Sequence, residues 1–250
     1  MFAVVKFDQE PKGLFKKLFW RFSKREVNAE KVSVAPGVFF FFLRCNFTPE
    51  HADWDLIEDA AGAMKNRLIF PEDIRMPEKF TSLPLEKLRQ RAFIKTALKI
   101  LKSEKCESVT IDDRNGIYIN DIENFVNLAP LIRVITNTPE RYDSVSERIM
   151  EKSGATLLLC DENTDLGRTW LVTYRGGAWH GESIKAITAA DVCFGAEKLI
   201  RLSKLSFNEE YLSLVPEGIE CEKFLSALYE YSHADFLENT LFAFEKACGT

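Results

Sequence analysis

The stretch that decides the fold runs from Glu107 to Asp161 and reads ESVTIDDRNGIYINDIENFVNLAPLIRVITNTPERYDSVSERIMEKSGATLLLCD. Three apolar runs of strand length alternate in it with two segments of helical period, and turn residues separate them. This alternation is typical of βαβαβ units with a parallel sheet. We predict strands at Ser108–Asp112, Leu131–Thr136 and Ala155–Cys160, covered on both faces by helices because the runs are nearly continuous in apolar residues.

The two segments between these strands carry helix signals. In the second, Thr138 can cap the helix, Pro139 suits its first position and Gly154 suits its end. Its predicted buried stripe comprises Tyr142, Val145, Ile149 and Met150. The first helix is shorter, beginning at Asn120, which has capping-box spacing to a glutamate, and stopping at Pro130.

Residues 107–119 allow two interpretations. In the first, the chain crosses over after Asp112 and leaves a long loop above the sheet, where a pocket can form. In the second, Val109–Asp112 and Ile117–Ile119 pair as a β-hairpin, with Gly116 in the left-handed position of a bulged turn. The hairpin would remove the loop and the pocket with it.

Composition bounds the class of protein. The 250 residues suffice for one large or two small domains, and 46% hydrophobic with 28% charged residues is ordinary for a globular chain. A net charge of −5 gives no broad footprint for nucleic acid or for an anionic membrane. The six cysteines and three histidines lack metal-ligand spacing, and no apolar run could span a bilayer. We therefore expect a soluble cytoplasmic protein with reduced cysteines and without a metal, nucleic-acid or membrane partner. The sequence leaves the oligomeric state open.

Residues 1–83 are predicted to form a separate α/β part, and residues 84–250 a second domain. In the first, we expect a strand at Phe2–Phe7, a buried strand after the Pro36–Gly37 break, and a helix over Glu50–Arg67. Leu68–Ser82 is expected to be an irregular connector.

A basic amphipathic segment, GLFKKLFWRFSKR, occupies Gly13–Arg25. One interpretation is a helix that binds a membrane surface or a partner. The other is a helix whose apolar side faces the core. We favour the core-facing helix, because the chain as a whole is acidic and a peripheral anchor usually has more positive charge around it.

The remaining chain is predicted to be mainly helical at its two ends. Helices are expected at Pro84–Ser103, Cys221–Ser232 and Ala234–Cys248, and a fourth strand at Thr169–Tyr174. Two segments are ambiguous and can form short strands: Ala186–Phe194 and Lys198–Phe207.

A binding site is expected at the carboxyl ends of the strands, since ligands of open parallel sheets bind there, where the strand order reverses. The two helix N-termini and the small polar groups at these ends suit a phosphate. Arg114 also lies at these ends, and the candidate binding residues are Asp112, Asp113, Asn115, Gly116, Thr136, Asn137, Thr138, Arg141 and Asp161.

The run ITNTPERYDSV, from Ile135 to Val145, resembles the second strand and turn of NADP-binding Rossmann domains of the shikimate dehydrogenase kind. The resemblance implies NADP as a cofactor, with Asn137, Thr138 and Arg141 receiving the adenosine 2′-phosphate. The first turn, DDRNGIYIN, departs from the family because it has one glycine where the family has G-x-G-x-x-G. The predicted fold class is α/β: a Rossmann-like parallel sheet flanked by helices, with an N-terminal α/β part and a helical C-terminal tail. It would bind a nucleotide or another small phosphorylated molecule, with or without catalysis.

A second resemblance is to haloacid-dehalogenase-like phosphatases. Asp112, Thr136, Lys152 and the pair Asp161 and Asp165 follow the order of that family's motifs. It would imply a nucleophilic Asp112 and a Mg²⁺ ion held by a second oxygen donor. The sequence departs at position 114, where the family has a second aspartate and this chain has arginine.

The glycine-dense loop Arg175–Glu182 contains Trp179 and His180. A histidine near a glutamate can act as a general base. Because no nucleophile is identifiable in the sequence, an exposed loop histidine is the favoured interpretation. A purely structural or partner-binding protein is the remaining alternative.

Overall fold

A computed structural model describes residues 1–13, 15, 19, 20, 22–80, 83, 85–191 and 193–246. The chain divides into two compact units. The first comprises Met1–Arg89 with Phe207–Asn239, and the second comprises Gln90–Ser206 with Thr240–Thr250. The division of the chain at residue 83 stays a prediction.

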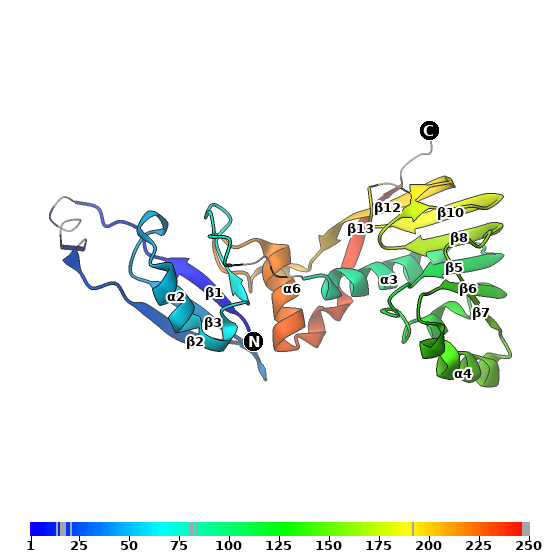
Figure 1. The fold of residues 1–250 in the computed structure, drawn as a ribbon, viewed down its shortest axis with the longest axis horizontal. Coiled ribbons are helices and arrows are strands. Elements are labelled where there is room, and N and C mark those ends of the chain that lie inside the picture. The colour runs from blue at the N-terminus through cyan, green and yellow to red at the C-terminus, as the bar shows by residue number, and fades with distance from the viewer. Residues whose placement is uncertain are drawn as a thin grey trace. The chain divides into compact units, whose positions relative to one another are not determined.

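The second unit is built on a seven-stranded sheet with the order β13-β12-β10-β8-β5-β6-β7 (Figure 1). All neighbouring strands run parallel except β12 and β13, which pair antiparallel. The strands are β5 (Ser108–Asp112), β6 (Leu131–Ile135), β7 (Leu157–Cys160), β8 (Arg168–Thr173), β10 (Ser183–Thr188), β12 (Ala196–Ser206) and β13 (Leu241–Lys246).

The strand order is that of a doubly wound Rossmann sheet. Counted along the chain from β5, the parallel strands lie in the order 3-2-1-4-5-6, with β13 added at one edge. The predicted fold class is thereby confirmed. The crossover interpretation of residues 107–119 is also confirmed, and the hairpin interpretation is wrong, because β5 pairs in parallel with β6 and β8.

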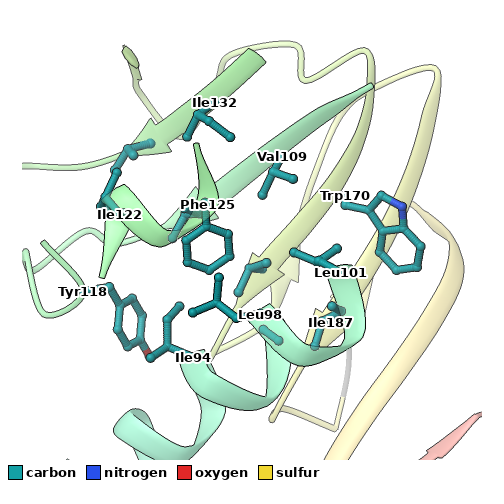
Figure 2. Packing of buried hydrophobic residues seen from close by; sticks show 14 of the residues in the cluster. Ile94, Leu98, Leu101, Val109, Tyr118, Ile122, Phe125, Ile132, Trp170 and Ile187 are labelled. Atoms are coloured by element: carbon teal, nitrogen blue, oxygen red, sulfur yellow. The ribbon is translucent and has the colours of Figure 1, made fainter. Parts of the chain in front are cut away.

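Helices cover one face of this sheet. They are α3 (Lys87–Leu101), η3 (Ile122–Phe125), η4 (Pro139–Tyr142) and α4 (Asp143–Ser153). Leu98 and Leu101 of α3 lie against Val109 of β5, with Phe125 packed beside them, in one buried cluster (Figure 2). The sheet contributes side chains from alternate positions, as a pleated strand requires. This cluster is the core of the second unit.

The helices between β5 and β7 agree in part with the sequence prediction. Helix α4 follows a short 3-10 turn that begins at Pro139, and it ends at Gly154 with a φ of +67°. The shorter helix is reduced to η3. Met150 was placed in the buried stripe, and this is wrong: its side chain is 58% exposed, whereas the neighbouring Ile149 is 3% exposed.

Strands and loops, instead of the expected helices, supply the described residues that pack on the other face. The cluster there comprises Ile135, Leu166, Leu171, Trp179, Ile184 and Ala186. The chain passes from β8 through β9 (Gly177–Ala178) to β10, and from β10 through β11 (Cys193–Phe194) to β12. Strands β9 and β11 pair with each other in parallel. These connections are too short for a crossover helix, which needs about a dozen residues.

The first unit contains a four-stranded sheet with the order β2-β3-β1-β4. Strands β2 and β3 form an antiparallel hairpin, and β1 pairs in parallel with β3 and β4. Its elements are β1 (Ala3–Phe7), β2 (Val27–Ala35), β3 (Val38–Cys45), η1 (Pro49–His51), α2 (Trp54–Ala61), η2 (Gly62–Met64) and β4 (Leu68–Ile69). Gly37 has a φ of +78°, which the hairpin turn requires.

The helices of residues 207–239 complete the first unit. They are α5 (Glu209–Leu212), α6 (Cys221–Ser232) and η5 (Asp235–Asn239). Phe224 of α6 packs edge-on against Phe2 and Phe40, with ring centroids 5.8 and 5.1 Å away. The predicted helix over Ala234–Cys248 is wrong: α6 ends at His233 with a φ of +56°, and the chain continues through η5 into β13. Cys248 lies outside the described residues.

The basic segment Gly13–Arg25 falls partly on residues 14, 16–18 and 21, which lie outside the described part of the chain, as does Pro84. The core-facing interpretation is wrong for the phenylalanines that the structure describes. Phe15, Phe19 and Phe22 are 78%, 76% and 83% exposed.

Two adjacent residues of α4 test the packing of the helical face. Ile149→Ala should lower the free energy of unfolding of the second unit by about 2–5 kcal/mol, because it leaves a cavity in the core. Met150→Ala should change it by less than about 0.5 kcal/mol, since that side chain is exposed. Amide hydrogen exchange of β5 and β6 measures both, and equal effects would contradict the packing described here.

Candidate functional site

The second unit has a cavity of about 220 Å³ at the carboxyl ends of β5, β6 and β8. Strand order reverses between β5 and β8, because the chain proceeds from β5 towards β7 on one side and from β8 towards β12 on the other. This is where ligands bind in open parallel sheets. The lining residues are Gln90, Asp112, Asp113, Arg114, Asn115, Ile117, Tyr118, Asn137, Tyr174, Arg175 and Gly176.

Asp113 holds the loop after β5 in place. Its carboxylate accepts hydrogen bonds from the backbone N–H groups of Ile117, at 2.6 Å, and Tyr118, at 2.8 Å. It also accepts one from the hydroxyl of Tyr142. With these donors in place and 2% of its surface exposed, Asp113 has a structural role.

Asp112 is the buried carboxyl group beside the cavity. Its two oxygens accept hydrogen bonds from the hydroxyl of Thr173, at 2.8 Å, and from Nε of Arg114, at 3.1 Å. Burial raises the pKa of Asp112 above its ordinary value, and the contacts with Thr173 and Arg114 oppose that rise. Asp112 is therefore a group that can take up a proton next to a bound ligand.

Two arginines line the cavity. Arg114 lies between the carboxylates of Asp112 and Glu162, with its NH1 group 3.1 Å from Glu162, and its guanidinium lies 5.4 Å from the centre of the Trp179 ring. These contacts fix the orientation of the guanidinium. Arg175 follows β8 on the opposite side of the crevice. Arginine pairs of this kind recognise phosphate and carboxylate groups.

Gly116 and Arg141 are in contact, although neither lines the cavity. The guanidinium of Arg141 donates a hydrogen bond to the carbonyl oxygen of Asn115 at 2.9 Å. A Cβ atom on Gly116 would lie 2.6 Å from NH1 of Arg141. The space directly above the glycine, through which a pyrophosphate approaches in dinucleotide-binding turns, is occupied by this side chain.

Two other predicted residues, Thr136 and Asp161, accept hydrogen bonds from groups within their own loops. The hydroxyl of Thr136 accepts a hydrogen bond from the backbone N–H of Thr138 at 3.1 Å. The carboxylate of Asp161 accepts from the backbone of Asn163 and the hydroxyl of Thr164, at 2.9 and 3.1 Å. The cavity thus brings together Asp112, Asp113, Arg114, Asn115 and Asn137, while Gly116, Thr136, Thr138, Arg141 and Asp161 lie outside its lining. Binding by any of them stays a prediction.

Several lining residues were missed in the sequence. Gln90 precedes the central stretch on α3, and Tyr174 and Arg175 follow β8. Tyr174 and Arg175 could have been found by applying the rule of strand carboxyl ends to the fourth predicted strand, whose end is Tyr174. Tyr118 could not, because its place depends on how Asp113 folds the loop. Burial raises the pKa of the Tyr118 hydroxyl, so this group stays protonated and can donate to a ligand.

The arrangement does not favour the phosphatase resemblance. Lys152 pairs with Glu123 at 3.1 Å, and Asp161 caps its own turn. Among the residues that the structure describes, no group of three His, Cys, Asp or Glu side chains could hold a metal ion. His180 is exposed, and Glu182 pairs with Arg168 at 3.0 Å, so the general-base interpretation of that loop gains no support either.

A larger cavity of about 980 Å³ lies in the first unit, at the ends of β1 and β3. Four carboxylates line it, on Asp8, Glu10, Glu50 and Glu217. These carboxylates outnumber the lining lysine, Lys6, so the lining repels an anion, whereas the crevice between β5 and β8 balances two aspartates with two arginines. The crevice is therefore the candidate site for a phosphorylated ligand.

Comparison with known proteins shows no family for this chain. No protein-family model matches the chain, and no curated protein matches it in sequence. The structure is similar to the crystal structure of L-tryptophan dehydrogenase from Nostoc punctiforme, with 13% identity and a TM-score of 0.29. The match covers 75% of this chain and 60% of that chain. A similarity at this level carries no argument about the fold or the site. Among the described residues, no helix is both long and apolar enough to cross a membrane.

Replacing each of the two adjacent aspartates by asparagine should change the free energy of unfolding in opposite directions. Asp113→Asn should lower the free energy of unfolding by about 1–3 kcal/mol, because an amide cannot accept from all three of its donors. Asp112→Asn should raise it at neutral pH, because it removes a charge that burial disfavours. Denaturant titration at pH 7 measures both.

The pH dependence of this stability difference is the control for Asp112→Asn. Because its folded-state pKa is raised, the carboxyl of Asp112 stabilises the fold fully below its unfolded pKa and loses this contribution as the pH rises through the folded pKa. The advantage of Asp112→Asn should therefore disappear on acidification towards pH 4. An advantage that is constant with pH would contradict the assignment.

Proposed function

We propose that this protein binds a small phosphorylated molecule in the crevice between β5 and β8. The observation that carries the proposal is the convergence of Arg114, Arg175 and the protonatable Asp112 on one cavity at the reversal of strand order. The two arginines would hold the phosphate, and Tyr118 and Asn137 would donate to the rest of the ligand.

The size of the cavity limits the ligand. Ligand pockets usually measure about 300–1,000 Å³, and this cavity measures about 220 Å³. A phosphate with a small attached group fits this volume, and a dinucleotide could place only one of its parts there. A mononucleotide would leave its base or sugar outside the crevice.

Charge couples binding to protonation. The lining holds two aspartates and two arginines, so it is neutral when both carboxyls are ionised. Uptake of a proton by Asp112 makes the lining positive and removes the repulsion between that carboxylate and an anionic ligand. We therefore infer that anions bind more tightly as the pH falls through the pKa of Asp112.

Inorganic sulfate tests this inference, because its charge does not change between pH 4 and pH 8. Titration calorimetry should show sulfate binding that strengthens on acidification. Arg175→Gln should weaken it about tenfold or more, since one charge-assisted contact is worth about 1.5–3 kcal/mol. The matched control is Arg148→Gln, which removes the same charge from the exposed partner of Glu123 and should leave binding unchanged.

Asp112→Asn should bind sulfate at pH 7 as tightly as the unaltered protein does at low pH, and its affinity should no longer depend on pH. Equal losses in Arg175→Gln and Arg148→Gln would show that only net charge matters. That result would remove the crevice from consideration.

An NADP-linked oxidoreductase is the second candidate, and the 3-2-1-4-5-6 strand order is the observation that favours it. Fold alone does not determine function. The position of Arg141 over Gly116 opposes it, because a pyrophosphate would have to displace that side chain.

A thermal-shift comparison separates the two candidates. A ligand at one hundred times its dissociation constant stabilises the folded state by about 2.7 kcal/mol. We expect AMP or inorganic phosphate to raise the melting temperature of the Arg141→Ala variant as much as that of the unaltered protein, and NADP to add nothing further. A large NADP shift that Arg141→Ala abolishes would instead establish the dinucleotide site.

A further inference from the structure

The strongest unexplained surface feature is a set of three exposed phenylalanines near the N-terminus. Phe15, Phe19 and Phe22 are 78%, 76% and 83% exposed. Of the other phenylalanines whose side chains the structure describes, only Phe194 is exposed, and the rest are buried or half-buried. Large apolar groups gathered on a surface mark a site of interaction.

The spacing of the three phenylalanines is that of one helix face. Phe15, Phe19 and Phe22 are each helical in the structure. Spacings of four and three residues place side chains on the same side of a helix, one turn above another. We call these three exposed side chains the aromatic stripe.

The charge of the segment indicates what covers the stripe. Between residues 13 and 25 the sequence has five basic residues and no acidic one, although the whole chain carries −5. Phenylalanine on one side and Lys or Arg between the apolar positions is the composition of helices that lie in the interface of an anionic membrane. A nucleic acid would meet the charge but would leave the apolar stripe in water.

We propose that residues 13–25 are a peripheral membrane-binding surface, in which basic side chains contact anionic lipid headgroups and Phe15, Phe19 and Phe22 enter the apolar layer. This surface lies on the membrane and does not span it, which agrees with the lack of a spanning helix among the described residues. The acidic composition of the chain made a membrane partner unexpected from sequence. The exposure of the three rings outweighs that argument.

Vesicle co-sedimentation with the full chain tests the proposal. Vesicles of phosphatidylcholine with 30% phosphatidylserine should bind the protein at low salt, and vesicles of phosphatidylcholine alone should bind it at least about tenfold more weakly. Binding to the anionic vesicles should fall as salt is added, because the headgroup contacts are screened.

Two sets of variants separate the contribution of the phenylalanines to membrane binding from that of the basic side chains. Replacing Phe15, Phe19 and Phe22 together by alanine should reduce binding about tenfold or more, while Phe194→Ala, which removes an exposed ring from the second unit, should not change it. Replacing Lys16, Lys17 and Lys24 by glutamine should weaken binding to the anionic vesicles about tenfold or more. The matched control replaces the exposed Lys99, Lys102 and Lys105 by glutamine, with the same loss of charge, and should retain binding.

The fluorescence of Trp20 provides an independent readout, because it lies inside the segment. Anionic vesicles should shift its emission to shorter wavelength, as measured against a Trp20→Phe variant. Absence of vesicle binding by the folded full chain would overturn the proposal. So would a concentration-dependent dimer that the triple phenylalanine variant abolishes, since the stripe would then be covered by a second copy.

Discussion

The candidate site depends on one buried carboxylate. Asp113 accepts hydrogen bonds from the backbone of Ile117 and Tyr118 and from the hydroxyl of Tyr142 on the next crossover. These bonds fold the loop after β5 back over the strand ends and fix it to the turn that precedes α4. Two further contacts hold the start of this loop: the backbone N–H of Asn137 donates to the carbonyl oxygen of Arg114 at 3.2 Å, and the guanidinium of Arg141 donates to that of Asn115 at 2.9 Å. Asp113 holds the later part, at Ile117 and Tyr118. The shape of the crevice is therefore a consequence of this aspartate, while its chemistry belongs to the neighbouring one.

The elements that cover the sheet differ on the two sides of this crevice. On the side of β6 and β7, 3-10 turns and α4 cover the sheet. On the side of β8, β10 and β12, the connections are so short that β9, β11 and buried side chains such as Trp179 replace helices on the opposite face. Reversal of strand order with connections of one hand places the two kinds of cover on opposite faces. Arg114 follows β5 and lies against Trp179 of this second half, and Arg175 follows β8.

The sequence predicted those features that local signals determine. The apolar runs at 108–112 and 131–135 and the Pro139 to Gly154 signals identified strands and α4, because periodicity and caps act within a few residues. It failed where long-range pairing decides: Leu241–Lys246 became a strand because it pairs with β12. In the site, Asp112, Asp113 and Asn137 were foreseen as strand ends. The sequence could not show that the carboxylate of Asp113 accepts hydrogen bonds from its own loop and from Tyr142, or that Arg141 covers Gly116. Both depend on side-chain contacts between separate elements.

The central claim is that the reversal of strand order forms an anion site held by two arginines. The most direct test is a crystal structure of the full chain soaked with tungstate, whose anomalous scattering locates it without ambiguity. We predict a tungstate peak within hydrogen-bond reach of the guanidinium groups of Arg114 and Arg175, with Asp113 still bonded to the loop. An empty crevice, or a peak only beside Arg141 above Gly116, would contradict the account.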